Sequence, residues 1–280
     1  MKKIFFVLFI STIALHSFGQ NNQTTNDKNT QSASDKKKQE RKDRINNLIK
    51  REEEGALIYS KQSAFGFKAA TDGWGASYEH GKYKTITKTN LWWAEIGGRK
   101  SANEEKISSE QDIGNGLILI GNPYVFGKIN NFYYLKAGIG QQYLIGGKGN
   151  KNGIAVSAIY GGGVTLGYLK PYYINIDTVG NGDGVDIKYQ ESTATYFTDP
   201  SIITGSSGFT KGFGEGKFVP GAFARVALRF DYGRYNEMLS AIETGVNLEY
   251  YSQKMPIMLN SKDKQFFINA YVAIEFGRRK

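Results

Sequence analysis

The residue types that could do acid–base chemistry are sparse in this sequence. Beyond the first twenty residues the only histidine is His80. A serine hydrolase needs a histidine base beside a serine nucleophile. Ser77 and Glu79 are close to His80 in sequence, but in a strand their side chains point to the opposite face. We therefore expect no catalytic residues, although a serine from a neighbouring strand leaves a His80-based lipid hydrolase open as an alternative.

Motifs for metals and cofactors are incomplete. Asn181–Asp186 resembles part of a calcium loop, but an oxygen donor at the fifth position is missing and Ser192 stands where the twelfth-position glutamate belongs. Gly161–Gly163 lies inside an apolar segment and does not open a helix, so it is not a phosphate loop. There are no cysteines, which excludes disulfides and metal thiolates. We predict neither a metal nor a cofactor.

The charged residues instead recur at alternate positions of apolar segments. This alternation is clearest in Phe218–Tyr232, Ile242–Tyr250 and Phe266–Phe276. A period of two indicates a strand with one apolar and one polar face. Strands of roughly ten residues with aromatic ends are typical of transmembrane β-barrels.

Eight such strands can be counted, and we predict an all-β protein: an eight-stranded antiparallel up-and-down transmembrane β-barrel at residues 62–277, with a short N-terminal helix. The two longest connections, about Gly98–Asn131 and Tyr172–Lys217, both fall on the outer side if the N-terminus is periplasmic. The expected strands are Ser63–Ala69, Trp74–Gly81, Ile86–Gly97, Phe132–Ile145, Ile154–Tyr168, Phe218–Tyr232, Ile242–Tyr250 and Phe266–Phe276.

The polar faces of these strands should meet inside the barrel. An eight-stranded barrel has an interior just wide enough for side chains, and unpaired charges there are costly. We therefore predict a plugged lumen with a buried ion-pair network, and keep a narrow ion path as the alternative. The network residues are Lys68, Glu79, Glu95, Lys136, Arg225, Arg229, Asp231, Glu243, Glu249 and Glu275; the expected interface aromatics are Trp74, Trp92, Tyr133, Tyr168, Phe230, Tyr250 and Phe276.

The N-terminal part of the chain differs in composition from the rest. Residues 1–19 have a positive start and a short apolar core, which is typical of a secretory signal peptide. Residues 20–34 are polar and should form a disordered spacer, and residues 35–55 should form a charged periplasmic helix. The net charge of +10 is scattered rather than striped. We expect association with outer-membrane lipids and lipopolysaccharide, and no nucleic-acid partner.

Three segments carry a resemblance to a known family: Phe18-Gly19-Gln20 at the end of the signal, Thr71-Asp72-Gly73-Trp74-Gly75, and the closing strand Phe266–Phe276. The chain resembles the small eight-stranded outer-membrane barrels of the OmpA and OmpX kind, including the Bacteroidetes-type proteins. Members usually end on an aromatic residue, whereas Gly277-Arg278-Arg279-Lys280 follows Phe276 here.

The resemblance implies an integral outer-membrane location and a non-enzymatic role, either structural or in surface binding through the long outer loops. Two alternatives remain: an accessory subunit of a larger envelope complex, docked to a protein partner through the N-terminal helix, and a lipid-modifying enzyme. A soluble periplasmic barrel with a hydrophobic ligand would need an apolar lumen, which the charged positions disfavour.

Overall fold

The computed structural model describes residues 38–43, 45–46, 59–85, 87–112, 118–149, 153–177, 184–234 and 237–280. The chain divides into two units, Met1–Ile45 and Asn46–Lys280. Residues 38–43 are helical, which confirms the short N-terminal helix. The predicted signal peptide and spacer, and part of the rejected calcium loop, lie outside the described residues. In the described part of the chain no helix is both long enough and apolar enough to cross a bilayer.

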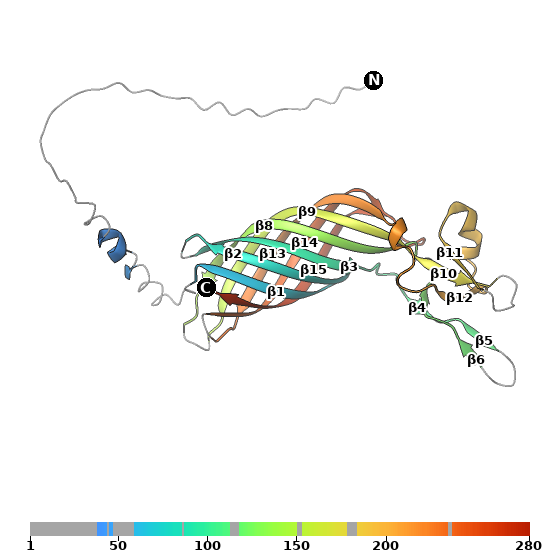
Figure 1. Ribbon diagram of the computed structural model, residues 1–280, viewed down its shortest axis with the longest axis horizontal. Helices are drawn as coiled ribbons and strands as arrows, with labels where there is room; N and C mark the ends of the chain where they lie inside the picture. Colours follow the sequence, from blue (N-terminus) through green and yellow to red (C-terminus); the bar gives the residue numbers. More distant parts are fainter. Residues whose placement is uncertain are drawn as a thin grey trace, which may run out of the picture. The chain divides into compact units, whose positions relative to one another are not determined.

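The second unit is a closed barrel of eight antiparallel strands (Figure 1). Each strand pairs with the next barrel strand along the chain, and β1 closes the barrel against β15 from Gln62↔Arg279 to Ala70↔Tyr271. This confirms the predicted up-and-down barrel. The strands are β1 (Lys61–Ala70), β2 (Gly73–Tyr83), β3 (Lys88–Arg99), β8 (Asn130–Gly146), β9 (Ala155–Pro171), β13 (Lys217–Asp231), β14 (Met238–Met255) and β15 (Lys264–Arg279).

Several strands are longer than the apolar alternation predicted. β14 runs from Met238 to Met255 instead of Ile242–Tyr250, and β15 continues to Arg279. Backbone ladder hydrogen bonds do not depend on side-chain polarity, so pairing continues into polar residues beyond the apolar belt. β8 and β9 are also extended, to Asn130–Gly146 and to Ala155–Pro171.

The two ends of the barrel differ. One end carries the connections 84–87, 147–154 and 232–237; we call it the short-turn end. The other carries 71–72, 100–129, 172–216 and 256–263; we call it the long-connection end. All long connections therefore lie at one end, as expected for this architecture.

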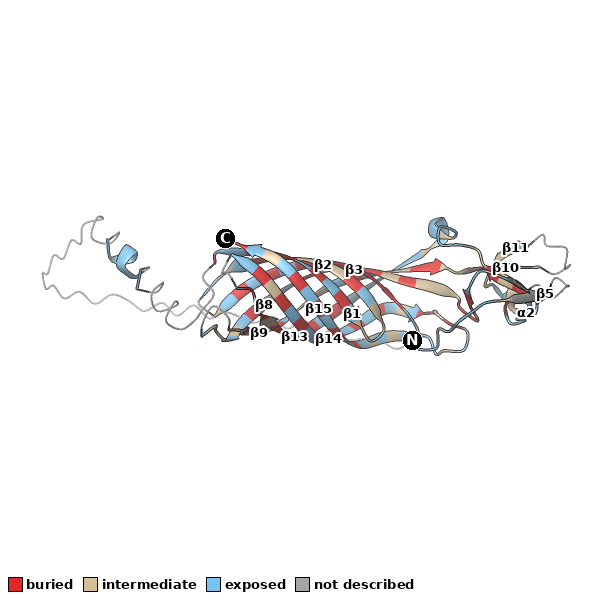
Figure 2. Ribbon diagram, turned by 90° about the horizontal axis from the view of Figure 1, so that it is seen from below, coloured by how far each residue is buried: buried red, intermediate tan, exposed pale blue. Residues whose placement is uncertain are grey.

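The alternation of side chains between interior and exterior is regular. Buried and exposed residues alternate along each strand (Figure 2). Large apolar side chains such as Phe67, Ile139 and Val226 are more than 60% exposed, so the apolar faces point outward. In water this would expose a large apolar surface, and a lipid environment removes that cost.

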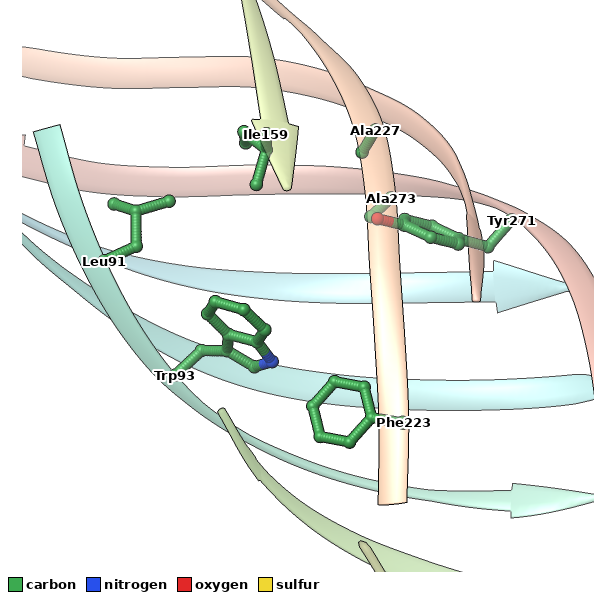
Figure 3. Close-up of a cluster of buried hydrophobic side chains, with 7 residues drawn as sticks. All are labelled: Leu91, Trp93, Ile159, Phe223, Ala227, Tyr271 and Ala273. Atoms are coloured by element: carbon green, nitrogen blue, oxygen red, sulfur yellow. The ribbon is translucent and has the colours of Figure 1, made fainter. Parts of the chain in front are cut away.

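The barrel interior has an aromatic centre around Trp93 (Figure 3). Trp93 belongs to a buried cluster with Leu91, Ile159, Phe223, Ala227, Tyr271 and Ala273. A Cβ atom added at Gly138 or Gly161 would lie 2.7 Å from the indole, and one at Gly140 would lie 3.0 Å from it. Glycine at these positions therefore makes room for the indole inside a narrow barrel.

The two long connections fold into a small module of their own, which we call the long-connection module (100–129 and 172–216). Its core consists of Tyr124, Ile174, Ile176, Phe197 and Ile203. The sequence interpretation treated these segments as loops and was wrong in this respect, because their apolar runs are short and broken by glycine and proline. The elements are β4 (Lys106–Ile107), β5 (Glu110–Asp112), β6 (Ile118–Ile120), β7 (Tyr124–Val125), β10 (Tyr173–Ile176), β11 (Val185–Lys188), η1 (Glu191–Thr193), α2 (Ala194–Phe197), β12 (Ile203–Ser206) and η2 (Phe213–Glu215).

Candidate functional site

The barrel interior is the first candidate site, because it brings together charges from seven strands. All ten residues predicted for the interior network are buried and each has an ion-pair partner. They lie at inward positions of β1, β2, β3, β8, β13, β14 and β15. The strand period alone places them on one face.

Arg229 is the centre of the group nearer the short-turn end. Its guanidinium donates to both carboxylate oxygens of Glu79, at 2.7 and 2.9 Å, and to Glu243 at 2.7 Å. Glu275 lies 2.7 Å from the same guanidinium. One fully buried arginine therefore joins carboxylates from three strands, in the forked geometry that guanidinium groups favour.

Arg225 lies beside this centre and joins it to the aromatic cluster. It contacts Glu79 at 3.1 Å and Glu243 at 3.6 Å. Its guanidinium carbon lies 4.1 Å from the centre of the Trp93 ring. The indole face thus meets a cation that is also held by carboxylates.

A second group lies nearer the long-connection end. Lys136 is 2.6 Å from Glu249 and 3.4 Å from Glu95, which also contacts Lys68 at 2.5 Å. Arg99 pairs with Glu249 and with Asp72. This group joins β1, β3, β8 and β14 across the interior.

Asp231 belongs to neither group. It pairs with Lys148 at 3.2 Å and with Arg279. These three residues form an ion-pair group at the short-turn end.

Several interior residues were missed at the sequence level. Arg99 and Arg279 were assigned to a loop and to a tail, but both continue the inward parity of their strands, Arg99 from Glu95 and Arg279 from Glu275. That parity was an available signal. With Arg99 and Arg279, and with Asp72 and Lys148 from the connections, the charged residues balance at seven cations and seven carboxylates. The cations are Lys68, Arg99, Lys136, Lys148, Arg225, Arg229 and Arg279, and the carboxylates are Asp72, Glu79, Glu95, Asp231, Glu243, Glu249 and Glu275.

Three of these carboxylates are close enough together to bind a metal ion. Oxygen atoms of Glu79, Glu243 and Glu275 lie within 4.8 Å of one another. The guanidinium of Arg229 contacts all three. We therefore assign the cluster to arginine, which supplies the positive charge that a metal would otherwise provide.

The predicted interface aromatics all lie on the outward face and form two groups, one toward each end of the barrel. Trp74, Tyr133, Tyr168 and Tyr250 are toward the long-connection end of their strands. Trp92, Phe230 and Phe276 are toward the short-turn end. Two aromatic girdles around an apolar band are the usual arrangement at the two membrane interfaces.

His80 has a serine neighbour on the adjacent strand. The Oγ of Ser63 lies 2.9 Å from Nδ1 of His80, across the β1–β2 pair on the outward face. Within the described residues His80 has no carboxylate partner. Backbone N–H groups on either side belong to the sheet, so they do not form an oxyanion hole.

A basic pocket of about 380 Å³ lies between the long-connection module and the barrel rim. Its lysines are Lys100, Lys106, Lys128, Lys170 and Lys211. Glu104 pairs with Lys128 at 2.6 Å, and burial lowers the pKa of Lys128. The pocket thus carries more cations than carboxylates.

Comparison with solved structures finds distant likenesses, and no family model or curated protein matches the sequence. Neisserial surface protein A is 7% identical (TM-score 0.38), over 79% of this chain and 94% of that one. The attachment invasion locus protein Ail of Yersinia pestis is 8% identical (TM-score 0.34), over 80% and 100%. The N-terminal β-barrel domain of Pseudomonas aeruginosa OprF is 9% identical (TM-score 0.29), over 77% and 96%.

Proposed function

We propose that this chain is an integral outer-membrane barrel without enzymatic activity, which conducts no solute and acts through its long-connection module. The observation that carries the proposal is the placement of side chains: apolar residues outside, and a charge-balanced, buried network with Trp93 inside. With the charged side chains inside, the outer surface is apolar, and a transmembrane barrel needs an apolar outer surface.

Membrane fractionation and gel mobility test the barrel and its location. The protein should be in the outer-membrane fraction, and on SDS gels the unboiled form should migrate differently from the boiled form. Recovery from the periplasm without a mobility difference would refute the proposal.

Recording in planar bilayers tests the closed interior. The folded wild type should give no defined single-channel conductance, because Arg229, Arg225 and Trp93 fill the middle of the barrel. A stable, reproducible conductance from the folded protein would contradict a plugged lumen.

The basic pocket supports an anionic partner for the module, and lipopolysaccharide is our candidate. Lys170 is 2% exposed, donates to the carbonyl oxygen of Phe209, and lies 4.7 Å from the Phe209 ring centre. Among the described residues it has no carboxylate partner, so an anionic group would complete its environment.

Lys100→Gln with Lys106→Gln should weaken lipopolysaccharide binding, whereas Lys217→Gln with Lys254→Gln, at exposed lysines outside the pocket, should not.

An accessory role in a larger complex is the first alternative, and the exposed Ile45 of the N-terminal segment is its support. Deletion of residues 21–54 separates the two roles. Loss of a co-purifying envelope protein would favour the accessory role, and an unchanged set of proteins would favour the barrel as an independent unit.

A lipid hydrolase is the second alternative, and the Ser63–His80 contact is the observation in its favour. His80→Ala and Ser63→Ala should each leave fatty-acid release from vesicles unchanged if the contact is only structural. Release by the wild type that both variants abolish would establish the enzyme instead.

A further inference from the structure

A row of polar side chains crosses the outward face toward the short-turn end. Lys61, Lys82, Asn90, Gln141 and Tyr160 are successive register partners on β1, β2, β3, β8 and β9. All five line an open groove of about 800 Å³ on the surface that the proposed function assigns to the membrane. This groove is separate from both the interior network and the basic pocket.

Hydrogen bonds order the neutral part of the row. The hydroxyl of Tyr160 donates to Oε1 of Gln141 at 2.8 Å, and Nε2 of Gln141 donates to Oδ1 of Asn90 at 3.4 Å. The acceptor oxygens of both amides are thereby used. The amide nitrogen of Asn90 is left as a donor next to Lys82, its register partner.

The charged part of the row lacks counter-ions. Lys61 and Lys82 are directly opposite one another on β1 and β2, and like charges in that position destabilise a strand pair. None of the residues lining the groove is acidic, and no carboxylate in the described part of the chain pairs with either lysine. An anionic group between the two ammonium groups would remove the repulsion.

The groove continues from the lysines into an apolar part. Trp92 and Ile139 form its wall and are 47% and 73% exposed. The backbone of Gly140 and Gly161 contributes to its floor, and glycine is present there because a Cβ would press on Trp93 inside the barrel. The groove therefore has an apolar part, formed by Trp92 and Ile139, next to its charged part, and a hydrocarbon chain is complementary to such a surface.

We propose that this groove binds one phospholipid of the membrane leaflet at the short-turn end. The ammonium groups of Lys61 and Lys82 and the amide of Asn90 hold the phosphate, and an acyl chain lies over Gly140 and Gly161 beside Trp92 and Ile139. The inference rests on the proposed membrane location. A free anion would use only the lysines, whereas a phospholipid matches the charged and the apolar parts together.

Native mass spectrometry of the detergent-purified full chain tests the site, with gel mobility first showing that the barrel is folded. Titration with phosphatidylglycerol should give one lipid that binds more tightly than the others. Lys61→Gln with Lys82→Gln should weaken that step by roughly ten- to thirtyfold, since each lysine near an anionic lipid contributes a severalfold gain. Lys254→Gln with Lys264→Gln, at exposed positions of β14 and β15 toward the long-connection end, should leave it unchanged.

The outcomes separate the two proposals. An unchanged first binding step in the Lys61/Lys82 variant would overturn the groove while leaving the barrel intact. Displacement of the lipid by inorganic phosphate at equal concentration would also overturn it, because the site would then recognise a free anion. Absence of a mobility difference would instead contradict the barrel itself.

Discussion

The interior network makes Arg229 the most informative position to change. Arg229→Met keeps much of the side-chain volume and removes the charge that contacts Glu79, Glu243 and Glu275. Glu79 and Glu243 keep contacts to Arg225, but Glu275 has no other cation partner among the described residues. The change therefore leaves Glu275 without a cation contact, and removing one partner of a buried ion pair costs about 3–5 kcal/mol of unfolding free energy.

Guanidinium unfolding in a fixed detergent, followed by gel mobility, measures this loss. With a slope of roughly 4 kcal/mol per M, the midpoint should fall by about 1 M. Arg234→Met, at an exposed arginine of a short turn, is the matched control and should change the free energy by less than about 0.5 kcal/mol. Glu275→Gln added to Arg229→Met should recover most of the loss. If Arg229→Met is as stable as the control, the carboxylates do not depend on Arg229 and the reasoning fails.

Three further outcomes are expected. Trp93→Ala, at a side chain that is 1% exposed, should cost about 3–5 kcal/mol in the same unfolding assay because it empties the middle of the barrel. Phe197→Ala, in the core of the long-connection module, should make that module sensitive to protease while the gel mobility of the barrel stays unchanged. The hydrogen bond from Lys188, followed by that from Tyr173, lowers the pKa of Glu215. The contacts of the Glu215 carboxylate with Lys188 and Tyr173 are complete above the ordinary pKa of a glutamate and are lost as the pH falls through the lowered pKa of Glu215. The ring resonances of Tyr173 should therefore titrate at that lowered pKa, and Glu215→Gln should abolish this titration.

The barrel was predictable because its strands face two different environments. An apolar exterior and an ion-paired interior impose a period of two, which is readable in Phe218–Tyr232 without any knowledge of partners. The alternation of inward positions continues to Arg99 and Arg279 and was also readable, but the expected strands were ended where the apolar residues stop. The polar ends of a strand show no hydrophobic alternation, so their register is determined only by backbone pairing with the neighbouring strand.

The long-connection module was not predictable in the same way. Its core joins Tyr124 from one connection to Ile174, Phe197 and Ile203 from another. Each short element of these connections contributes one or two apolar residues without a period, and the contacts that bury them join segments far apart in the sequence. The partners within the interior network were also beyond the sequence, since parity gives the face of Glu79 but not its pairing with Arg229 across the barrel.

The three tryptophans of this chain report on two separate events of folding. Trp74 and Trp92 are about half exposed on the outward face, whereas Trp93 is enclosed with its ring beside Arg225. With the proposed membrane location, the environment of the first two changes when the strands enter the lipid phase. The environment of Trp93 becomes native only when β3, β8, β9 and β13 have come together around it. Emission from single-tryptophan variants would therefore time membrane insertion and barrel closure independently, and show whether the barrel closes before or after it enters the bilayer.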